Sequence, residues 1–483
     1  MTRVPQLLNT NNLVQLPSAL FADLQMDRIL SEETIAVLQQ PCGLMEIERR
    51  NELFVLLDKD EIRLQAENAL SVLSANRRAV YLLHEAEIPL DRYYRFLEMM
   101  ESYIASCEVL TSMHQSGILF AQIAAYYKDE AKMKTLLTMK ESAKKIRKLL
   151  LKMSQGFLSF ADSHWLTPPY NAVSEFDSIA ASAENLGFTV PQKKLLNTKI
   201  NLSLSDAICH LFSDEVAQME DEIARYSDID FYEPTMYIPG IKFFLELHSL
   251  IMRAAKIGVP CCIAKIARTP KYIARELYDV SLLAKNCEYI IANDGNFTKK
   301  EPFWFLIGAN GGGKTTYLRA VGINLMLFLA GCPVFAKEAE IYPFDIVLSH
   351  FPKDERFDNT GRLDEERKRT EEMLSAAQNK TAFLFFNETF SGTDEKRGFG
   401  LLHDVAAKIE KDGHFGIYVT HFHEVVSLNY PILQSKVDVT EENKRTFRIK
   451  RFSGNASSYA ADILKKYRLD KDSLCARRCL YGN

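Results

Sequence analysis

A glycine-rich segment in the C-terminal half of the chain has the composition of a phosphate-binding loop. Residues 308–315 read Gly-Ala-Asn-Gly-Gly-Gly-Lys-Thr and fit the pattern G-x-x-x-x-G-K-[ST] without a mismatch. Glycines allow backbone N–H groups to wrap a β-phosphate, the lysine pairs with β- and γ-phosphate oxygens, and the hydroxyl binds Mg²⁺. The pattern therefore predicts binding of ATP with Mg²⁺. The residues predicted to hold the nucleotide are Gly308, Ala309, Asn310, Gly311, Gly312, Gly313, Lys314 and Thr315.

An Asn-Glu pair after a second apolar run is the candidate for the acidic part of the same site. Residues 383–386 are all apolar, which suits a strand buried on both faces, and Asn387 and Glu388 follow directly. Glu388 is predicted to act as general base or to position the attacking water. Asn387 stands where an aspartate of the magnesium shell is usual, so weaker Mg²⁺ affinity or slower turnover is expected. The alternative is a strand that ends in two solvated polar residues. The predicted metal-site residues are Thr315, Asn387 and Glu388.

A histidine after the next apolar run is the third candidate. Thr420 and His421 follow residues 415–419, and a histidine at this place could contact the γ-phosphate. A lone histidine after a strand is more often structural. Its place one strand beyond the acidic pair nevertheless favours a functional role here. Lys314, Glu388 and His421 are therefore the predicted catalytic residues.

Short apolar runs alternate with helical segments around these residues. The alternation predicts a mostly parallel sheet with helices on its faces. Residues from about 53 to 285 instead place apolar residues at three- and four-residue spacing, which predicts a helical region. The polar stretch 293–300 is the predicted boundary between the two regions. The predicted strands are 303–307, 345–349, 382–386 and 415–419, and the predicted helices are 314–330, 363–378 and 397–411.

The bulk composition is that of a folded protein with more than one domain. The chain has 483 residues, of which 47% are apolar and 25% charged, and its formal net charge is −4. A basic body that coats nucleic acid is therefore not indicated. The nine cysteines form no paired CxxC set, so we expect reduced thiols in a cytoplasmic protein rather than a zinc site. The sequence predicts neither a signal peptide nor a membrane span.

The motifs around the phosphate-binding loop resemble those of the MutS family of DNA-repair ATPases. The resemblance is strong over residues 288–470 and weaker over 19–61. Two segments depart from the family pattern. One is Asn387, and the other is 359–369, where Thr360 and Gly361 could still reach a partner subunit's ATP and the charge run that follows is typical of a solvated helix face. The segments that carry the resemblance are 290–294, 316–319, 330–336, 339–341 with Asp345, 387–393 with Gly398, 419–422 and 448–460.

The resemblance implies an ABC-type P-loop ATPase domain preceded by an all-α core and lever domain. It adds Thr316 to the phosphate loop and places Tyr289 and Asn293 in a wall against the adenine. It also implies a homodimer that completes the ATPase sites, with helical arms that open and close around mismatched or structured DNA. On this interpretation the amino-terminal domains that read a mismatch have no counterpart in this sequence. The implied divisions are a tail at 1–18, the helical domain at 19–287, the ATPase domain at 288–470 and a tail at 471–483.

Two basic segments could neutralise nucleic-acid phosphates. One is 132–152, which is predicted to be helical, and the other is 444–451. A solvated helix face is the alternative for the first segment. No base-reading motif or aromatic stacking platform is visible, so the prediction of a DNA partner depends mainly on the resemblance. Two other functions stay open: a poorly hydrolysing ATP-dependent switch or scaffold, which Asn387 favours, and an ATPase that acts on RNA or a ribonucleoprotein.

Overall fold

The computed structural model describes most of the chain. Contacts divide it into two compact units, residues 1–8 with 56–245 and residues 9–55 with 246–483. We call the first the helical unit and the second the α/β unit. The domain limits predicted after residues 18, 287 and 470 stay predictions, and the contacts group the chain differently. The described residues are 4–8, 15–113, 118–163, 198–285, 290–352, 362–391, 394–438 and 444–452.

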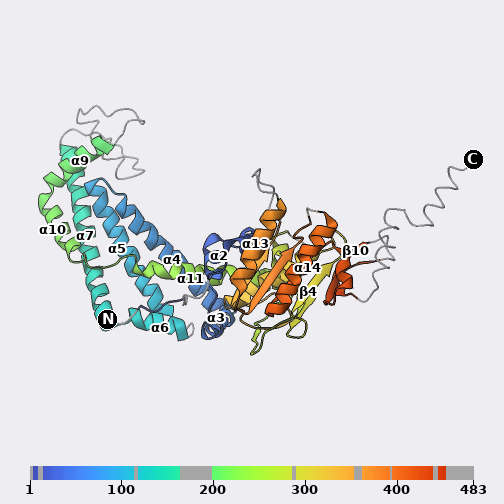
Figure 1. Cartoon of the computed structure of the whole chain (residues 1–483). Helices are drawn as coiled ribbons and strands as arrows, with labels where there is room; N and C mark the ends of the chain where they lie inside the picture. Colours follow the sequence, from blue (N-terminus) through green and yellow to red (C-terminus); the bar gives the residue numbers. More distant parts are fainter. Residues whose placement is uncertain are drawn as a thin grey trace, which may run out of the picture. The chain divides into compact units, whose positions relative to one another are not determined.

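A six-stranded sheet lies at the centre of the α/β unit (Figure 1). The strand order is β10-β9-β4-β8-β7-β6, and all neighbouring pairs are parallel except the edge pair of β9 and β10. The four strands predicted from apolar runs are confirmed to within one residue, whereas β9 was not predicted. The strands are β4 (Phe303–Ile307), β6 (Ile346–His350), β7 (Ala382–Asn387), β8 (Phe415–Val419), β9 (Ile432–Asp438) and β10 (Lys444–Arg451).

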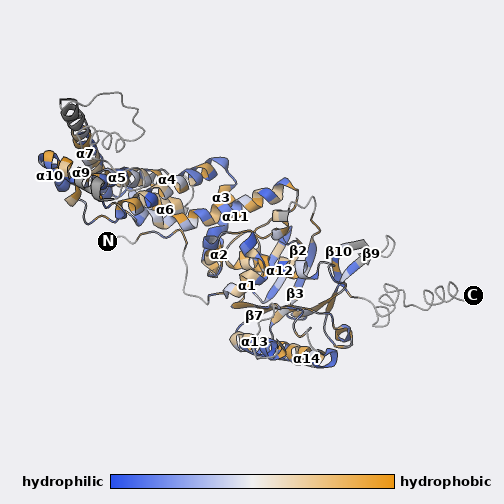
Figure 2. Ribbon diagram, turned by 90° about the horizontal axis from the view of Figure 1, so that it is seen from above, coloured by the Kyte–Doolittle hydropathy of each residue, from blue (hydrophilic) through white to orange (hydrophobic). Residues whose placement is uncertain are grey.

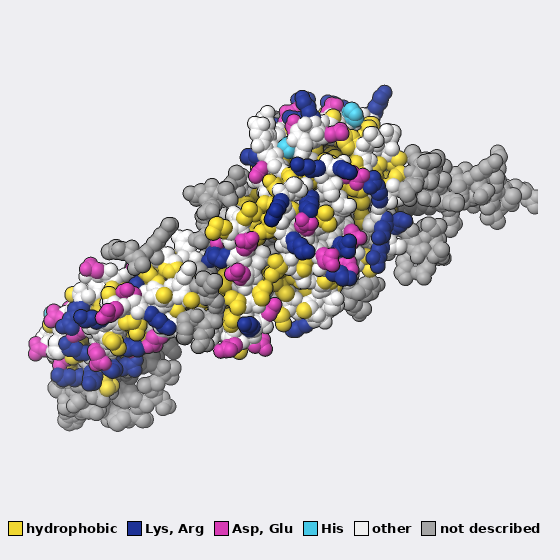
Figure 3. Space-filling model, turned by 90° about the horizontal axis from the view of Figure 1, so that it is seen from below, with side chains coloured by type: hydrophobic (Ala, Val, Ile, Leu, Met, Phe, Trp, Pro, Cys, Tyr) yellow, Lys and Arg dark blue, Asp and Glu magenta, His cyan; other side chains and the backbone are white. Residues whose placement is uncertain are grey.

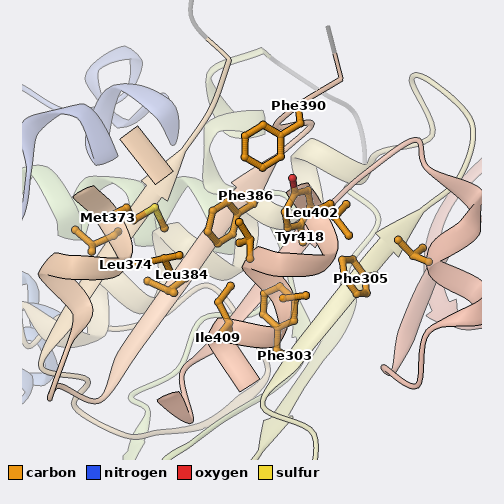
Figure 4. Packing of buried hydrophobic residues seen from close by; sticks show 14 of the residues in the cluster. Phe303, Phe305, Met373, Leu374, Leu384, Phe386, Phe390, Leu402, Ile409 and Tyr418 are labelled. Atoms are coloured by element: carbon orange, nitrogen blue, oxygen red, sulfur yellow. The ribbon is translucent and has the colours of Figure 1, made fainter. Parts of the chain in front are cut away.

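Helices cover both faces of this sheet. Figure 2 shows α12 (Lys314–Leu329) on one face, with α13 (Arg362–Ala377) and α14 (Glu395–Asp412) on the other. Successive residues of a strand point to opposite faces, so the strands contribute to two cores. The core under α13 and α14 is shown in Figure 4 and joins apolar side chains from both helices to those of β4, β7 and β8. Because both faces are covered, β4 and β8 consist only of buried residues.

Local signals fix the ends of α14. Asp394 precedes the helix, and its side chain accepts a hydrogen bond from Arg397 N at 3.1 Å. Gly413 follows the helix with a φ of 69°, the left-handed conformation that ends many helices. The predicted helix 397–411 is thus confirmed and extended by one turn or less at each end.

A second, four-stranded sheet corrects the prediction of an all-α region up to residue 287. The strands run in the order β1-β5-β2-β3, and two of them fall inside the region predicted to be helical. The prediction failed here because β2 mixes cations with apolar residues and so lacks the continuous apolar run of a buried strand. In the structure, its buried Tyr272 packs edge-on against Phe297 and Phe383. The segment 293–300, predicted as a boundary, contains β3. The strands are β1 (Lys265–Ile266), β2 (Lys271–Leu277), β3 (Asn293–Thr298) and β5 (Glu338–Ile341).

Short helices from the start of the chain complete the α/β unit. Buried polar contacts tie them to the end of α12: Cys42 N donates to Leu329 O at 2.9 Å, and the fully buried Arg50 donates to Ala330 O at 2.9 Å. These contacts explain why residues 9–55 group with the sheet rather than with the helical unit. The elements near the start of the chain are α1 (Ser18–Asp23), η1 (Met26–Arg28), α2 (Glu32–Leu38) and α3 (Leu44–Leu57). Later in the chain come α11 (Ile238–Lys256), η4 (Val280–Lys285) and η5 (His423–Ser427), and both α3 and α11 cross the limits between the two units.

The helical unit is a bundle of long amphipathic helices. Acidic residues open α4, and Pro89 opens α5, both of which are usual at helix N-termini. Apolar residues at helical spacing form its core, in which Leu73, Met100, Met139 and Ile146 are fully buried. The helices are α4 (Asp60–His84), α5 (Pro89–Ser112), α6 (Ile118–Tyr127), α7 (Glu130–Ser163), α9 (Thr198–Leu211), α10 (Ser213–Ala224) and η3 (Glu233–Tyr237).

Candidate nucleotide site

The sheet brings the three predicted clusters to one edge. Strands β4, β8 and β7 are parallel neighbours, so the segments that follow them emerge side by side at their carboxyl ends. Thr420 N donates to Leu306 O at 3.1 Å, and Glu388 N donates to Val419 O at 2.8 Å. The histidine strand β8 therefore lies between the phosphate-loop strand and the acidic strand. This is the edge of an open α/β sheet at which ligands commonly bind.

The phosphate loop follows β4 and ends at the first residue of α12. Gly308, Gly311 and Gly313 have φ values of 138°, 68° and 91°, which L side chains rarely adopt. The neighbouring strand β9 closes the loop from one side, because the buried Ser435 donates its hydroxyl to Gly312 O at 2.8 Å. A Cβ on Gly308 would lie 2.8 Å from Ser435 Cβ. The loop thus needs glycine for space as well as for backbone conformation.

The lysine of the loop is buried inside it. Lys314 Nζ donates to Gly308 O at 2.8 Å and is 3.3 Å from Ala309 O and 3.4 Å from Asn310 Oδ1. Its exposed fraction is 4%. Burial lowers the pKa of the ammonium group, and the nearby Glu388 carboxylate opposes this shift. Oxygen atoms thus surround the cation at the start of α12, where a helix N-terminus also favours anions.

Thr315 and Asn387 meet across the sheet edge. Thr315 Oγ1 donates to Asn387 Oδ1 at 3.3 Å, which joins the first turn of α12 to the end of β7. Thr316 follows and is half-buried. A hydroxyl and an amide oxygen are both hard ligands that suit Mg²⁺, either directly or through its water shell. These two neutral groups beside Glu388 therefore form a donor set that fits Mg²⁺.

Glu388 is paired with His421 in this structure. His421 Nε2 lies 2.9 Å from Glu388 Oε1, and both side chains are about one-third exposed. The hydrogen bond from His421 holds the pKa of Glu388 below its usual value, against the opposing effect of burial, and the charge of Lys314 adds to the lowering. The carboxylate is thus held in its ionised form, ready to accept a proton or orient a water molecule.

The predicted adenine wall is described only in part. Tyr289 lies outside the described residues. Asn293 binds the backbone of β10 on both sides, because its amide donates to Phe447 O at 3.1 Å and accepts from Ile449 N at 2.7 Å. This contact holds Phe447 close to the loop: its ring lies 3.4 Å from where a Cβ of Gly313 would be, and 46% of the residue is exposed. Whether Asn293 contacts a base stays a prediction.

Sequence reasoning missed two residues at the loop, Ser435 and Phe447. Nothing in the sequence around Ser435 indicates a role, because its contact with the loop depends on the pairing of β9 with β4. Phe447 had a signal, since Phe447 and Ile449 alternate with charged residues as in a half-buried strand. Thr360 and Gly361, predicted to reach a partner subunit, lie outside the described residues, as do Gly392 and Thr393.

The basic segment on α7 is largely paired with acidic side chains of the same unit. Lys145 Nζ lies 2.7 Å from Glu222, whose side chain is 2% exposed, and Lys152 Nζ lies 2.5 Å from Glu215. Figure 3 shows Lys and Arg side chains interspersed with Asp and Glu on the helical unit. Most of these pairs join α7 to neighbouring elements of the helical unit, whereas the Lys144–Glu141 pair lies within α7. The remaining described ion pairs are Lys132–Glu233, Lys140–Glu108, Lys144–Glu141 and Arg147–Glu101.

The second basic segment lies on the edge strand β10. Arg451 is paired with Glu301 at 2.7 Å, and its guanidinium lies over the Trp304 ring, 5.2 Å from the centroid. Arg448 and Lys450 are exposed. Cations on an edge strand also hinder pairing with other strands, so this pattern has a structural explanation beside any contact with nucleic acid.

Comparison with known proteins shows which family the C-terminal part of the chain is similar to. The family model described as MutS domain V matches residues 304–465, which contain the loop, the acidic pair and the histidine. DNA mismatch repair protein msh-2 of Neurospora crassa is 32% identical over 146 residues, which cover 29% of this chain and 16% of that protein. Over residues 304–465 the chain is therefore similar to the MutS family of DNA mismatch repair proteins.

Two further mismatch-repair relatives match longer parts of the chain at lower identity. DNA mismatch repair protein MutS of Chlorobium limicola is 26% identical over 185 residues, 37% of this chain and 21% of that protein. DNA mismatch repair protein spellchecker 1 of Drosophila melanogaster is 26% identical over 281 residues, 53% of this chain and 30% of that protein. The chain thus spans less than a third of the length of these relatives. Among the described residues, no helix is long and apolar enough to cross a membrane, and the cytoplasmic location stays a prediction.

Proposed function

We propose that residues 303–452 form an ABC-type P-loop ATPase site that binds and hydrolyses Mg²⁺-ATP. Residues 308–313 and Lys314 bind the phosphates, Thr315 and the water shell at Asn387 hold the ion, Glu388 orients the attacking water, and His421 lies near the γ-phosphate. The observation that carries the proposal is the convergence of these groups at the carboxyl ends of β4, β8 and β7. Phosphoryl transfer depends on positioning of the reactants and on stabilisation of charge. The site offers a glycine loop, a buried cation, a carboxylate and a histidine for these two tasks.

Each residue has a task that its present contacts support. Lys314 donates hydrogen bonds to neutral carbonyl oxygens of the loop, which phosphate oxygens of higher charge can replace. Mg²⁺, when bound, neutralises charge that develops on the phosphates. Glu388 is ionised and therefore able to accept a proton from water, and His421 holds it in place. Release of His421 from Glu388 toward a γ-phosphate would free the carboxylate for that water.

Steady-state ATP hydrolysis with Mg²⁺ tests this function. The wild-type chain should hydrolyse ATP, and Glu388→Ala should reduce kcat by about 100-fold or more, because general-base catalysis contributes that much. Glu424→Ala is the matched control, since this carboxylate is exposed and lies three residues beyond His421. Turnover that survives in Glu388→Ala would show that the activity does not come from this site.

We also propose that the protein acts, as a homodimer, as an ATP-dependent clamp on mismatched or structured DNA. The mismatch-repair relatives support this target, whereas the cations of α7, most of which pair with acidic side chains, add no independent support for it. Binding of mismatched duplex, branched duplex and single-stranded RNA over a range of salt concentrations tests the target. Equal or tighter binding of the RNA would favour a ribonucleoprotein target. Stimulated hydrolysis with branched or mismatched duplex alone would support the clamp.

A second candidate is a switch that binds ATP without useful hydrolysis. It is favoured by Asn387, whose neutral amide faces Thr315 where a carboxylate would add negative charge for Mg²⁺. Such a protein would bind ATP tightly and dimerise with it, and hydrolysis would not depend on Glu388. Light scattering with and without ATP, beside the hydrolysis assay, separates the two functions.

A further inference from the structure

The turn that follows β7 carries two non-glycine residues in the left-handed conformation. Glu388 has a φ of 53° and Phe390 a φ of 65°. This conformation is an outlier for a bulky residue and persists only where the surrounding structure holds it in place. Phe390 is 1% exposed and belongs to the core between the sheet, α13 and α14 (Figure 4). The strained turn begins at the predicted catalytic carboxylate, so its support bears on the geometry of the site.

Three buried side chains from three different elements hold this turn. Glu366 of α13 accepts a hydrogen bond from Phe390 N through Oε2 at 2.8 Å. His350, the last residue of β6, places Nδ1 3.0 Å from Thr389 Oγ1. Tyr418 of β8 donates its hydroxyl to Thr389 O at 2.9 Å. The backbone after β7 is therefore fixed residue by residue.

Glu366 differs from the other acidic residues of α13. The charge run at the start of this helix was expected to be a solvated face, and Asp364, Glu365 and Arg367 are indeed exposed. Glu366 is only 6% exposed, so the expectation is wrong for this residue. A carboxylate in the interior is costly unless it is hydrogen-bonded, and a backbone N–H donor to a carboxylate makes one of the stronger hydrogen bonds. Its place is explained by what it binds.

We propose that Glu366 is a positioning residue that aims the Glu388 carboxylate at the phosphate loop. The proposal rests on the proposed function. Glu388 N is anchored to Val419 O at 2.8 Å, and Phe390 N is anchored to Glu366, so only Thr389 separates the two anchors. Loss of the second anchor lets the strained φ angles relax and rotates Glu388 away from the attacking water. Helix α13 thereby becomes part of the hydrolytic apparatus, and any partner or ligand that shifts it would change turnover.

Two substitutions at Glu366 in the full-length chain test this role. Glu366→Met fills a similar volume but removes the acceptor, and Glu366→Gln keeps a weaker, neutral acceptor. We expect kcat to fall about 10- to 100-fold in Glu366→Met, as for small displacements of catalytic groups, and about threefold in Glu366→Gln. KM and the Kd for ATP should stay within about twofold of wild type, because the phosphate loop is untouched. Glu372→Ala, an exposed acid on the same helix, is the control.

The outcomes separate this inference from the proposed function. Hydrolysis that depends on Glu388 but keeps its wild-type kcat in Glu366→Met would overturn the positioning role alone. A parallel loss of ATP affinity and kcat would also overturn it, because that pattern indicates a merely structural role. If Glu366→Met does not fold, Glu366→Gln decides: wild-type kcat in this variant overturns the inference. Absence of Glu388-dependent hydrolysis in the wild type would overturn both the inference and the proposed enzyme.

Discussion

The contact between Gly312 and Ser435 permits a prediction about the phosphate loop that uses two substitutions. An alanine Cβ at position 312 would overlap Ser435 Oγ and lie 3.0 Å from Ala309 O. No positive φ is involved at this glycine, so the effect of Gly312→Ala is one of space alone. The loop must move away from β9 to make room. Overpacking of this kind costs about 1–3 kcal/mol, which corresponds to roughly 5- to 150-fold weaker ATP binding if the loop bears the whole displacement.

Removal of the serine hydroxyl should reverse much of this loss. Ser435→Ala alone deletes one hydrogen bond to Gly312 O, worth about 1 kcal/mol, so ATP binding should weaken about fivefold. In the double variant the overlap with Oγ is gone, and the remaining contacts are 3.0 Å to Ala309 O and 3.3 Å to Ser435 Cβ. We therefore expect the double variant to bind ATP more tightly than Gly312→Ala, with a coupling energy of about 1–2 kcal/mol.

Titration with a fluorescent ATP analogue in the presence of Mg²⁺ measures these affinities, with thermal unfolding as a check on folding. Gly400→Ala is the matched control, because a Cβ at this position of α14 meets nothing within 4 Å. ATP affinity of Gly312→Ala equal to that of Gly400→Ala would refute the geometry described for the loop. Additive effects of the two substitutions would show that Ser435 does not set the position of the loop.

Three further predictions concern the ion, the pH dependence and the helical unit. Asn387→Asp places a charge beside Thr315, so the Mg²⁺ concentration for half-maximal hydrolysis should fall about fivefold, whereas the exposed Asn379→Asp should leave it unchanged. His421 lowers the pKa of Glu388 from its ordinary 4.5, so the stabilisation from this pair is present above pH 4.5 and is lost as the pH falls through the lowered value. In His421→Ala, urea unfolding should show less of this acid-dependent loss, and an unchanged pH profile would contradict the pairing. Glu222→Ala deprives Lys145 and Ser142 of their buried acceptor, so the free energy of unfolding should fall by about 1–3 kcal/mol. The control Glu141→Ala removes an exposed carboxylate and should leave this free energy unchanged. Equal stability of the two variants in urea would be evidence against the ion-pair account of α7.

The strands that carry the site could be predicted because their residues are nearly all apolar. Residues 303–307 and 415–419 match β4 and β8 at both ends, since a strand buried on both faces leaves a continuous apolar run between polar residues. The strands β2 and β3 gave no such signal. Charged residues interrupt β2, and β3 reads Asn-Asp-Gly-Asn-Phe-Thr. Neither strand could therefore be predicted from its composition. β2 lies between β3 and β5 in the sheet, and its Tyr272 pairs with Phe297 of β3 and with Ile341 of β5, which is far along the chain.

Local motifs identified the chemical groups of the site but not their arrangement. The loop at 308–315 and the pair Asn387-Glu388 could be read from spacing alone. The position of β8 between β4 and β7 could not, because chain order does not give strand order, and it is this order that places His421 against Glu388. Glu366 was hidden for a similar reason. Its neighbours in sequence are exposed charges, and only packing against the turn after β7 distinguishes it.

Single-turnover hydrolysis is the most direct test of the central claim, that this edge of the sheet hydrolyses ATP. The protein is held in excess over labelled ATP with Mg²⁺, at concentrations where both wild type and Glu388→Ala bind all of the nucleotide. The account predicts that the wild type converts bound ATP to ADP at least about 100-fold faster than the variant. Equal rates of hydrolysis in the wild type and Glu388→Ala, with equal ATP binding, would contradict the claim that this edge of the sheet hydrolyses ATP. The protein would then be interpreted as a nucleotide-binding switch.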